Sequence, residues 1–149
     1  MIWVAAAIIE KDDRLLICQR RAQGVLALKW EFPGGKLRPG ETPWEGLARE
    51  LREELGIEAR IGAQLYKIFY RYAEEKLDVK VVFYSASFAG WPLNRAFERI
   101  EWVSRSELRR YDFLAADRVL VTRLVQDEWA KGRITRQSTS RRRRPAPAR

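Results

Sequence analysis

Hydrophobic residues in the first part of the chain fall into runs that are typical of β-strands. Ile2–Glu10 and Arg14–Arg20 are largely apolar and are joined by the polar segment Lys11–Asp13, which predicts a β-hairpin. Ile61–Tyr72 and Leu77–Phe88 are rich in aromatic and β-branched residues and are separated by a polar turn. These four runs predict the long strands of a sheet.

Two shorter runs predict shorter strands. Lys29–Phe32 is the first of them, and we expect Pro33-Gly34-Gly35 to end it, because proline and glycine interrupt regular structure. Ile100–Val103 is the second. Both would extend the same sheet.

The segment after the first short strand predicts a helix with clear ends. Thr42 is a candidate N-cap, Pro43 takes the first helical position, and Glu45 completes a capping box. The helix should run to Leu55, where Gly56 supplies the left-handed residue that ends many helices. At the α-helical period its apolar face would consist of Trp44, Leu47, Ala48, Leu51 and Leu55.

Two further helices are predicted towards the C-terminus. A second capping box, Ser104–Glu107, opens a brief helix, and a longer helix should cover about residues 118–130. Two main helices packed on one mixed sheet indicate an α/β fold.

Positive charge is concentrated at the C-terminal end of the chain. The net charge is +9, and eight of the 29 Lys and Arg residues lie between Lys131 and Arg149, so residues 1–130 hold 21 of them against 20 Asp and Glu. From Gly132 onward the composition is too polar to bury the surface that would offset chain entropy. We therefore expect one folded domain, residues 1–130, and a basic, disordered tail, residues 131–149.

The composition also argues against several classes of protein. The chain has no histidine, which removes His-dependent triads and the usual zinc sites, and its single Cys18 cannot form an intrachain disulfide. No apolar run approaches the roughly 18 residues of a membrane span. We expect a cytoplasmic protein with no membrane segment.

Three carboxylates share one side of the predicted helix. Glu50, Glu53 and Glu54 fall within an arc of about 100° beside the apolar face, where like charges repel one another. Clustered carboxylates suit Mg²⁺, which commonly bridges a few of them to substrate phosphates. The alternative is a solvated face stabilised by pairs such as Arg49 with Glu53. Helical periodicity alone leaves both interpretations open.

The residues around this helix resemble the signature of the Nudix hydrolases, GX5EX7REUXEEXGU, in which U is a bulky aliphatic residue. Every specified position is filled, by Gly35, Glu41, Arg49, Glu50, Leu51, Glu53, Glu54, Gly56 and Ile57. Leu15–Arg21, Trp30–Gly35 and Glu101–Val103 also look like MutT-type members, so the resemblance covers nearly all of residues 1–130. It implies a Nudix fold, an α/β/α sandwich with a mixed central sheet and the signature on a loop–helix–loop.

The resemblance implies roles for the signature residues. Glu50, Glu53 and Glu54 would hold Mg²⁺, or Mn²⁺, with a loop carbonyl near Gly35. Glu50 would also be the candidate base for the attacking water, with Glu41 as the alternative base and Arg49 orienting a carboxylate. In MutT-like enzymes the products are a nucleoside monophosphate and pyrophosphate. Bound metal ions would neutralise the phosphates and lower the pKa of the water.

Two features outside the signature bear on the phosphates and the metal. Arg20 or Arg21, at the end of the second strand, could contact phosphate as a guanidinium fork, although either could equally be an exposed strand end. MutT carries a further metal-binding glutamate at the position of Ala96, so the number of metal ions is open here.

The base would be recognised outside the signature. MutT-like proteins place a base-binding residue just before the last helix, where this chain has Asp117. An ionised carboxylate only accepts hydrogen bonds, which favours guanine, 8-oxoguanine or cytosine. Asp117 could equally be the N-cap of that helix. Phe32 and Phe113 are candidate walls for stacking the base.

The sequence leaves three functional hypotheses. The first is a nucleoside triphosphate pyrophosphohydrolase acting on oxidised nucleotides such as 8-oxo-dGTP, with CTP or dCTP as the alternative substrate. The second is an RNA-end-processing or nucleic-acid-binding protein that uses the Arg141–Arg144 run of the tail. The third is a nucleotide sensor without hydrolysis. Family members that act on ADP-ribose often carry a proline beyond the signature, and the absence of proline between Ile57 and Gly90 therefore disfavours ADP-ribose as the substrate. The oligomeric state is not predicted.

Overall fold

The structure is a computed structural model that describes residues 1–126. Residues 127–149, with the predicted tail and the end of the last predicted helix, lie outside the described part of the chain. The sheet has seven strands in the order β3-β2-β1-β6-β5, with β4 paired to β1 and β7 paired to β2. The strands are β1 (Ile2–Lys11), β2 (Arg14–Gln19), β3 (Trp30–Glu31), β4 (Gly34–Lys36), β5 (Arg60–Tyr72), β6 (Leu77–Ser87) and β7 (Arg99–Ser104).

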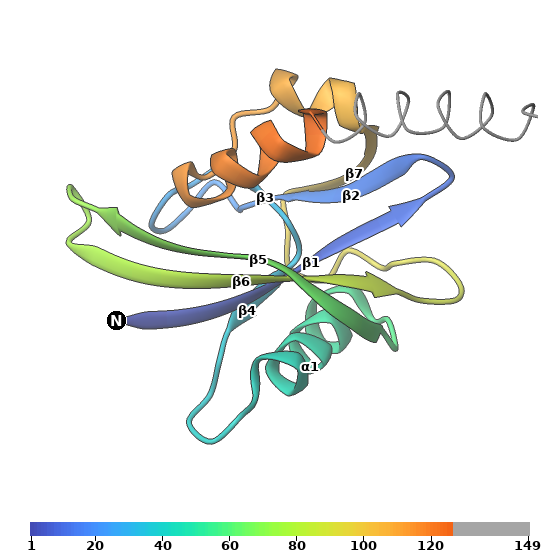
Figure 1. Cartoon of the computed structure of the whole chain (residues 1–149), viewed down its shortest axis with the longest axis horizontal. Coiled ribbons are helices and arrows are strands. Elements are labelled where there is room, and N and C mark those ends of the chain that lie inside the picture. The colour runs from blue at the N-terminus through green and yellow to red at the C-terminus, as the bar shows by residue number, and fades with distance from the viewer. Residues whose placement is uncertain (127–149) are drawn as a thin grey trace, which may run out of the picture.

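Helices cover both faces of this sheet (Figure 1). One face carries α1 (Pro43–Leu55), and the other carries the 3-10 helix η1 (Arg105–Arg110) and a C-terminal helix, residues 115–126. The long strands β1 and β6 pair in parallel, whereas β5 and β6 pair in antiparallel fashion. The predicted α/β/α sandwich with a mixed sheet is therefore confirmed.

Strand β1 serves both apolar layers at once. Ala5, Ala7 and Ile9 pack on the side of α1, while Ala6 and Ile8 pack on the side of the C-terminal helix, because successive side chains of a strand point to opposite faces. A strand covered on both faces needs an unbroken apolar run, which explains the composition of this segment.

The predicted hairpin between β1 and β2 is present. Glu10 pairs with Leu15 and Lys11 with Arg14, so the turn consists of Asp12 and Asp13. Both have positive φ values, 52° and 60°, as the central residues of a type I′ turn require. Asp tolerates this conformation better than most residues, so the turn chemistry agrees with the register.

Helix α1 has the predicted boundaries. Thr42 accepts a 3.2 Å hydrogen bond from the Glu45 amide, the Glu45 carboxylate accepts one of 3.0 Å from the Thr42 amide, and Gly56 closes the helix at φ 63°. Leu47, Leu51 and Leu55 are buried as expected. The prediction that Trp44 faces the core is wrong, since the residue is half-exposed.

The predicted break after the first short strand is present, since β3 ends at Glu31 and Pro33 lies in neither strand. The chain then enters a second short strand, β4, which was not predicted and which pairs with β1. Glycine allows this pairing, because a Cβ on Gly34 would collide with the carbonyl of Ala5. The C-terminal helix begins at residue 115, within a few residues of the predicted start.

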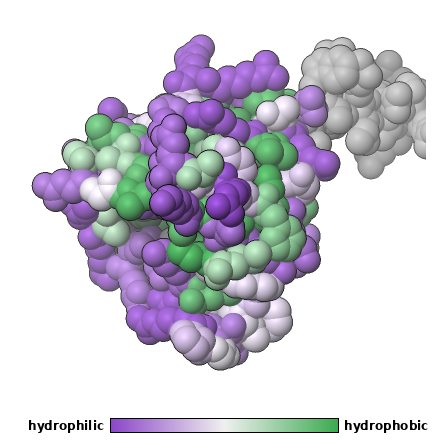
Figure 2. Space-filling view, turned by 90° about the vertical axis from the view of Figure 1, so that its left-hand side faces the viewer, coloured by the Kyte–Doolittle hydropathy of each residue, from purple (hydrophilic) through white to green (hydrophobic). Residues whose placement is uncertain are grey.

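No helix in residues 1–126 is long and apolar enough to cross a membrane. Figure 2 shows the face towards which the N-terminus and the β5–β6 turn point, and apolar side chains gather there among charged ones. Both of these elements contribute to the rim of a cavity, through Ile2 and through Glu75 and Leu77.

Candidate active site

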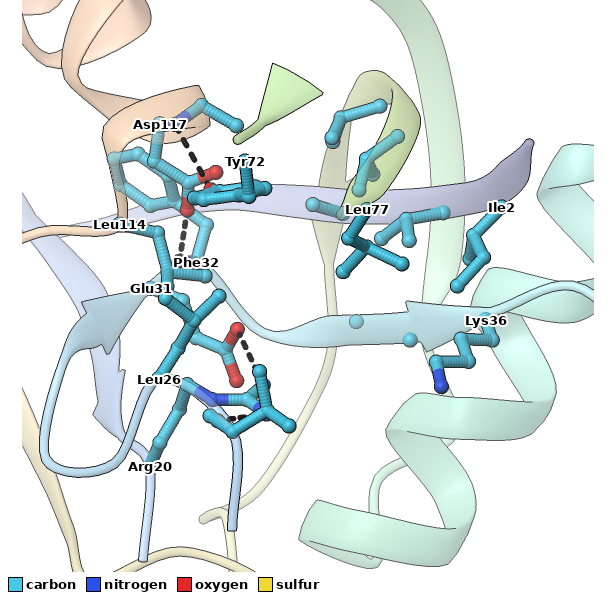
Figure 3. Close-up of a pocket in the computed structure, with 18 of the residues that line it drawn as sticks. Ile2, Arg20, Leu26, Glu31, Phe32, Lys36, Tyr72, Leu77, Leu114 and Asp117 are labelled. Carbon is cyan, nitrogen blue, oxygen red and sulfur yellow. Dashed lines mark hydrogen bonds and ion pairs between the residues drawn. The ribbon is translucent and has the colours of Figure 1, made fainter. Parts of the chain in front are cut away.

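A cavity of about 490 Å³ extends from α1 to the start of the C-terminal helix. Its polar lining includes Glu50 and Glu54 of α1, and Asp117 of the C-terminal helix. Apolar side chains from β1 and β6, among them Val4, Ala6, Val79 and Val81, form part of its wall (Figure 3). A mostly apolar cavity with a few convergent polar groups is the usual form of a small-ligand site.

The three glutamates of the acidic stripe are not equivalent in the fold. Glu50 and Glu54 line the cavity, whereas Glu53 does not and its side chain is 49% exposed. Burial, together with the negative charges of Glu50, Glu31 and Glu53, raises the pKa of Glu54 to about 8. Ionised carboxylates at this place therefore repel one another unless a cation neutralises them.

Arg49 holds the carboxylates next to the cavity in position. Its guanidinium bonds Glu41 through two nitrogens at 2.7 and 2.8 Å, Glu50 at 2.9 Å and Glu53 at 3.2 Å. It also donates to the Lys36 carbonyl at 3.1 Å. This hydrogen bonding lowers the pKa of Glu41 to about 2. A single arginine thus fixes the loop before α1 to the acidic stripe.

Glu31 is a cavity residue that was not predicted as part of the site. Burial raises its pKa to about 7, against the opposing effect of Arg20, whose Nη1 lies 3.4 Å from the carboxylate. The Nε of Arg20 is buried without a hydrogen-bond partner among the described residues. The sequence feature that could have indicated Glu31 is its place between two large aromatic residues, Trp30 and Phe32, both of which are buried.

Of the two candidate phosphate contacts at the end of β2, only one reaches the cavity. Arg20 lines it, whereas Arg21 donates a 2.9 Å hydrogen bond to the carbonyl of Ala96 and does not. The position at which MutT has its additional glutamate is thus bound, through its backbone, to an arginine. Glu98 and Glu101, the acidic residues that follow Ala96 most closely in the sequence, do not line the cavity.

Asp117 lies in the cavity wall with its carboxylate bonded to the backbone between β3 and β4. Its Oδ2 accepts a 3.1 Å hydrogen bond from the amide of Phe32, and only 4% of the residue is exposed. The N-cap interpretation is wrong, because Asp117 lies within the helix and its own amide donates to Leu114 O at 2.9 Å.

The two phenylalanines proposed as cavity walls differ in position. Phe32 lines the cavity. Phe113 lies behind it, with the ring centroids 5.2 Å apart, and is 1% exposed. The prediction that Phe113 forms a wall is therefore wrong, because its ring supports Phe32 from within the core.

Comparison with known proteins identifies the family. The NUDIX domain model matches residues 2–124. The chain belongs to the Nudix family. It is accordingly a Nudix hydrolase, and the acidic helix α1 with its flanking loops is the Nudix box.

Several characterised relatives cover most of the chain. The CTP pyrophosphohydrolase of Escherichia coli K12 is 38% identical over 117 residues, which are 78% of this chain and 86% of that protein. The 8-oxo-dGTP diphosphatase of Haemophilus influenzae is 36% identical over 129 residues, 85% and 93% of the two chains. The solution structure of the Escherichia coli ORF135 protein has a TM-score of 0.72 at 36% identity, covering 82% of this chain and 86% of that one. These relatives support a Nudix pyrophosphohydrolase that acts on nucleotides.

Nudix hydrolases generally use divalent metal ions, and the cavity partly fits such an ion. Within residues 1–126 no three Asp, Glu or Cys side chains converge as ligands, and Glu53 is bonded to Arg49 outside the cavity. Glu50 and Glu54 nevertheless face it together, and Mg²⁺ commonly takes one or two carboxylates with substrate phosphates and water. A cation bound between these carboxylates would offset the burial and the mutual repulsion that raise the pKa of Glu54 in the metal-free protein.

Proposed function

We propose that this Nudix hydrolase uses Mg²⁺, with Mn²⁺ as a substitute, to convert a nucleoside triphosphate and water into a nucleoside monophosphate and pyrophosphate, and that 8-oxo-dGTP is its substrate. The observation that carries the substrate assignment is the buried carboxyl of Asp117 at the far end of the cavity from the acidic helix. A group held there can read a base while the phosphates lie near Glu50 and Glu54.

The chemistry of the base end favours bases with N–H donors. Oδ2 of Asp117 is engaged by Phe32, so Oδ1 is the oxygen available to a ligand. Guanine and 8-oxoguanine offer N1–H and N2–H₂, which a carboxylate can accept. The naming of relatives such as the Haemophilus influenzae enzyme supports an oxidised guanine nucleotide.

CTP or dCTP is the second candidate substrate. Cytosine offers the N4 amino group to the same oxygen, and the Escherichia coli relative that is 38% identical is named for CTP. The apolar walls formed by Val4, Ala6 and Val81 suit either base, because they impose no hydrogen-bond pattern of their own.

The phosphate end supplies the chemistry of the cleavage. Glu50 and Glu54, with the carbonyl of Gly35, would hold the metal, and Glu53 would join them by a change of rotamer. A bound divalent ion would neutralise the phosphates and acidify the attacking water. Glu50 would then accept the proton of that water, and Arg20 would contact the phosphates.

The contacts of Glu41 favour a positioning role over a role as base. Its carboxylate receives both forked hydrogen bonds of Arg49 and a third, of 2.7 Å, from the Arg38 amide. A carboxylate with its oxygens so occupied and a pKa of about 2 is a weak proton acceptor. We assign to it the placement of Arg49, which in turn orients Glu50.

The test is a comparison of kcat/KM, with Mg²⁺, for oxidised and normal forms of each nucleoside triphosphate. Product identification in ¹⁸O water would locate the attacked phosphorus. We expect monophosphate and pyrophosphate, with 8-oxo-dGTP preferred over dGTP. Turnover confined to cytosine nucleotides would favour CTP or dCTP over 8-oxo-dGTP as the substrate. No turnover of any nucleotide would exclude both candidates.

A role for the basic tail in nucleic-acid binding is a separate proposal, since residues 131–149 lie outside the described part of the chain. Its eight positive charges would give salt-sensitive binding without sequence preference. Removal of these residues should weaken binding to single-stranded RNA and leave nucleotide hydrolysis unchanged. Equal RNA affinity of the full chain and the shortened chain would show that the tail does not contribute to RNA binding.

A further inference from the structure

Tyr72 stands beside Asp117 in the wall of the cavity (Figure 3). It is the last residue of β5 and is 8% exposed. Its hydroxyl oxygen accepts a 3.0 Å hydrogen bond from the amide of Ala116, in the first turn of the C-terminal helix. The first amides of a helix have no partner within the helix, so this contact satisfies one of them and fixes the phenol in place.

The proton of this hydroxyl remains available. A phenol donates one hydrogen bond and accepts others, and the Ala116 amide uses only its accepting side. Among residues 1–126 the Tyr72 hydroxyl takes part in the hydrogen bond from Ala116 and donates none of its own. Burial and the nearby Asp117 charge raise the pKa of Tyr72 to about 12, so the group stays protonated wherever a nucleotide hydrolase would operate.

Asp117 offers the complementary half of a recognition pair. Its Oδ2 is engaged by the Phe32 amide, and none of the described residues donates to Oδ1. The cavity therefore presents an O–H donor from β5 next to a carboxyl oxygen from the C-terminal helix. Both are held by backbone amides, which means that neither has to be ordered when a ligand binds.

We infer that Tyr72 is a specificity-determining residue whose hydroxyl donates a hydrogen bond to an acceptor atom on the edge of the substrate base, adjacent to the N–H group that meets Asp117. The inference rests on the proposed function. In guanine the acceptor is O6, next to N1–H, and in cytosine it is N3, next to the N4 amino group. The same pair of side chains thus serves both candidate bases.

The experiment pairs one variant with substrate analogues that lack the acceptor. In 6-thioguanine nucleotides sulfur, a weak acceptor, replaces O6, and in 3-deazacytidine nucleotides a C–H replaces N3, while the neighbouring donor is kept. For whichever base the wild-type enzyme hydrolyses, we expect kcat/KM to fall about tenfold from the natural nucleotide to its analogue. In Tyr72→Phe this ratio should approach one, because the donor is missing.

Tyr70→Phe is the matched control. Tyr70 precedes Tyr72 by two positions on the same face of β5, with ring centroids 4.7 Å apart, and it does not line the cavity. This variant should keep the wild-type ratio. If Tyr72→Phe lowers kcat/KM equally for nucleotide and analogue, the hydroxyl only supports the helix and the inference is wrong. The inference is also wrong if the wild-type enzyme hydrolyses the natural nucleotide and its analogue equally well. This second test does not depend on the folding of any variant.

The result is separable from the fate of the proposed function. Failure of the wild-type enzyme to hydrolyse any nucleoside triphosphate would remove the proposed function and the inference together. Hydrolysis by the wild-type enzyme with an unchanged ratio in Tyr72→Phe would leave the function standing and remove the role of Tyr72 alone.

Discussion

The carboxylate of Asp117 and the amide of Phe32 are joined by a 3.1 Å hydrogen bond across 85 positions of the chain. The bond ties the C-terminal helix to the segment that precedes β4. Burial, reinforced by the Glu31 charge, raises the pKa of Asp117 to about 8. In the free protein at neutral pH this carboxyl is therefore mostly neutral, and a base that presents N–H donors would draw it towards the ionised form.

Replacement of Asp117 by asparagine should change base selection. The amide oxygen of Asn can still accept from Phe32, but its NH₂ would then face the N–H donors of guanine or cytosine. We expect kcat/KM for these nucleotides to fall by about 100-fold, with a smaller loss for uracil or thymine nucleotides.

The same substitution at Asp112 is the control for this comparison. Asp112 bonds Lys29 and Arg118 on the surface and does not line the cavity. Asp112→Asn should leave the order of preferred nucleotides unchanged. A uniform loss across all bases in Asp117→Asn would show that the carboxyl supports the fold without reading the base.

Local signals were sufficient to predict α1 and the β1–β2 hairpin. Thr42, Glu45 and Gly56 act on neighbours within one or two turns, so their roles can be read from spacing. The assignment of the box residues came from the resemblance to the Nudix signature, because helical periodicity alone left the acidic stripe open to two interpretations. The half-exposed Trp44 was mispredicted because helical periodicity says which side faces inward but not how far the sheet extends over that side.

Long-range contacts account for what the sequence did not predict. The partner of Asp117 is the backbone amide of Phe32 in the segment between β3 and β4, which local spacing could not reveal, so the sequence suggested an N-cap that the fold does not use. Glu31 and Tyr72 reach the cavity only because β3 and β5 converge with the C-terminal helix. Contacts of this kind depend on tertiary packing, which outweighs local preference.

The stability of the metal-free protein should fall between mildly acidic and mildly alkaline pH. The folded-state pKa of Asp117, about 8, lies above the ordinary aspartate value of 3.8, so the unfolded chain releases this proton first. The contribution of Asp117 to the free energy of unfolding is therefore fully present below pH 3.8 and is lost as the pH rises towards 8. The raised pKa values of Glu31 and Glu54 act in the same direction.

Urea denaturation in EDTA at a series of pH values would measure this effect. The free energy of unfolding of wild-type protein should decline between pH 5 and pH 8, and Asp117→Asn should reduce the decline by on the order of a few kcal/mol. Parallel curves for the two proteins would mean that Asp117 titrates normally in the fold.

Glu54→Gln should separate stability from activity. Removal of one charge from the carboxylate cluster relieves repulsion, so the metal-free variant should be more stable than wild type at pH 8, by about 1 kcal/mol after allowance for solvent screening. Hydrolysis supported by Mg²⁺ should fall at least about 100-fold, because a ligand is lost.

Glu58→Gln provides the matched change at an exposed glutamate that pairs with Arg52. It should leave hydrolysis near the wild-type rate. Full activity of Glu54→Gln at low Mg²⁺ concentration would exclude Glu54 from the metal site.

Gly35→Ala should inactivate the enzyme through Glu50. A Cβ on Gly35 would lie 2.7 Å from Oε2 of Glu50, so the carboxylate has to move away from β4. Since Arg49 bonds Oε1 of the same carboxylate at 2.9 Å, displacement should disturb this contact, cost the proposed base its position and lower kcat with little change in KM.

Gly40→Ala is the control, because Gly40 has φ 82° and no atom lies close to an added Cβ. This variant should lose about 1 kcal/mol of stability and retain its kcat. Should both variants keep kcat, the contact between Gly35 and Glu50 has no part in catalysis.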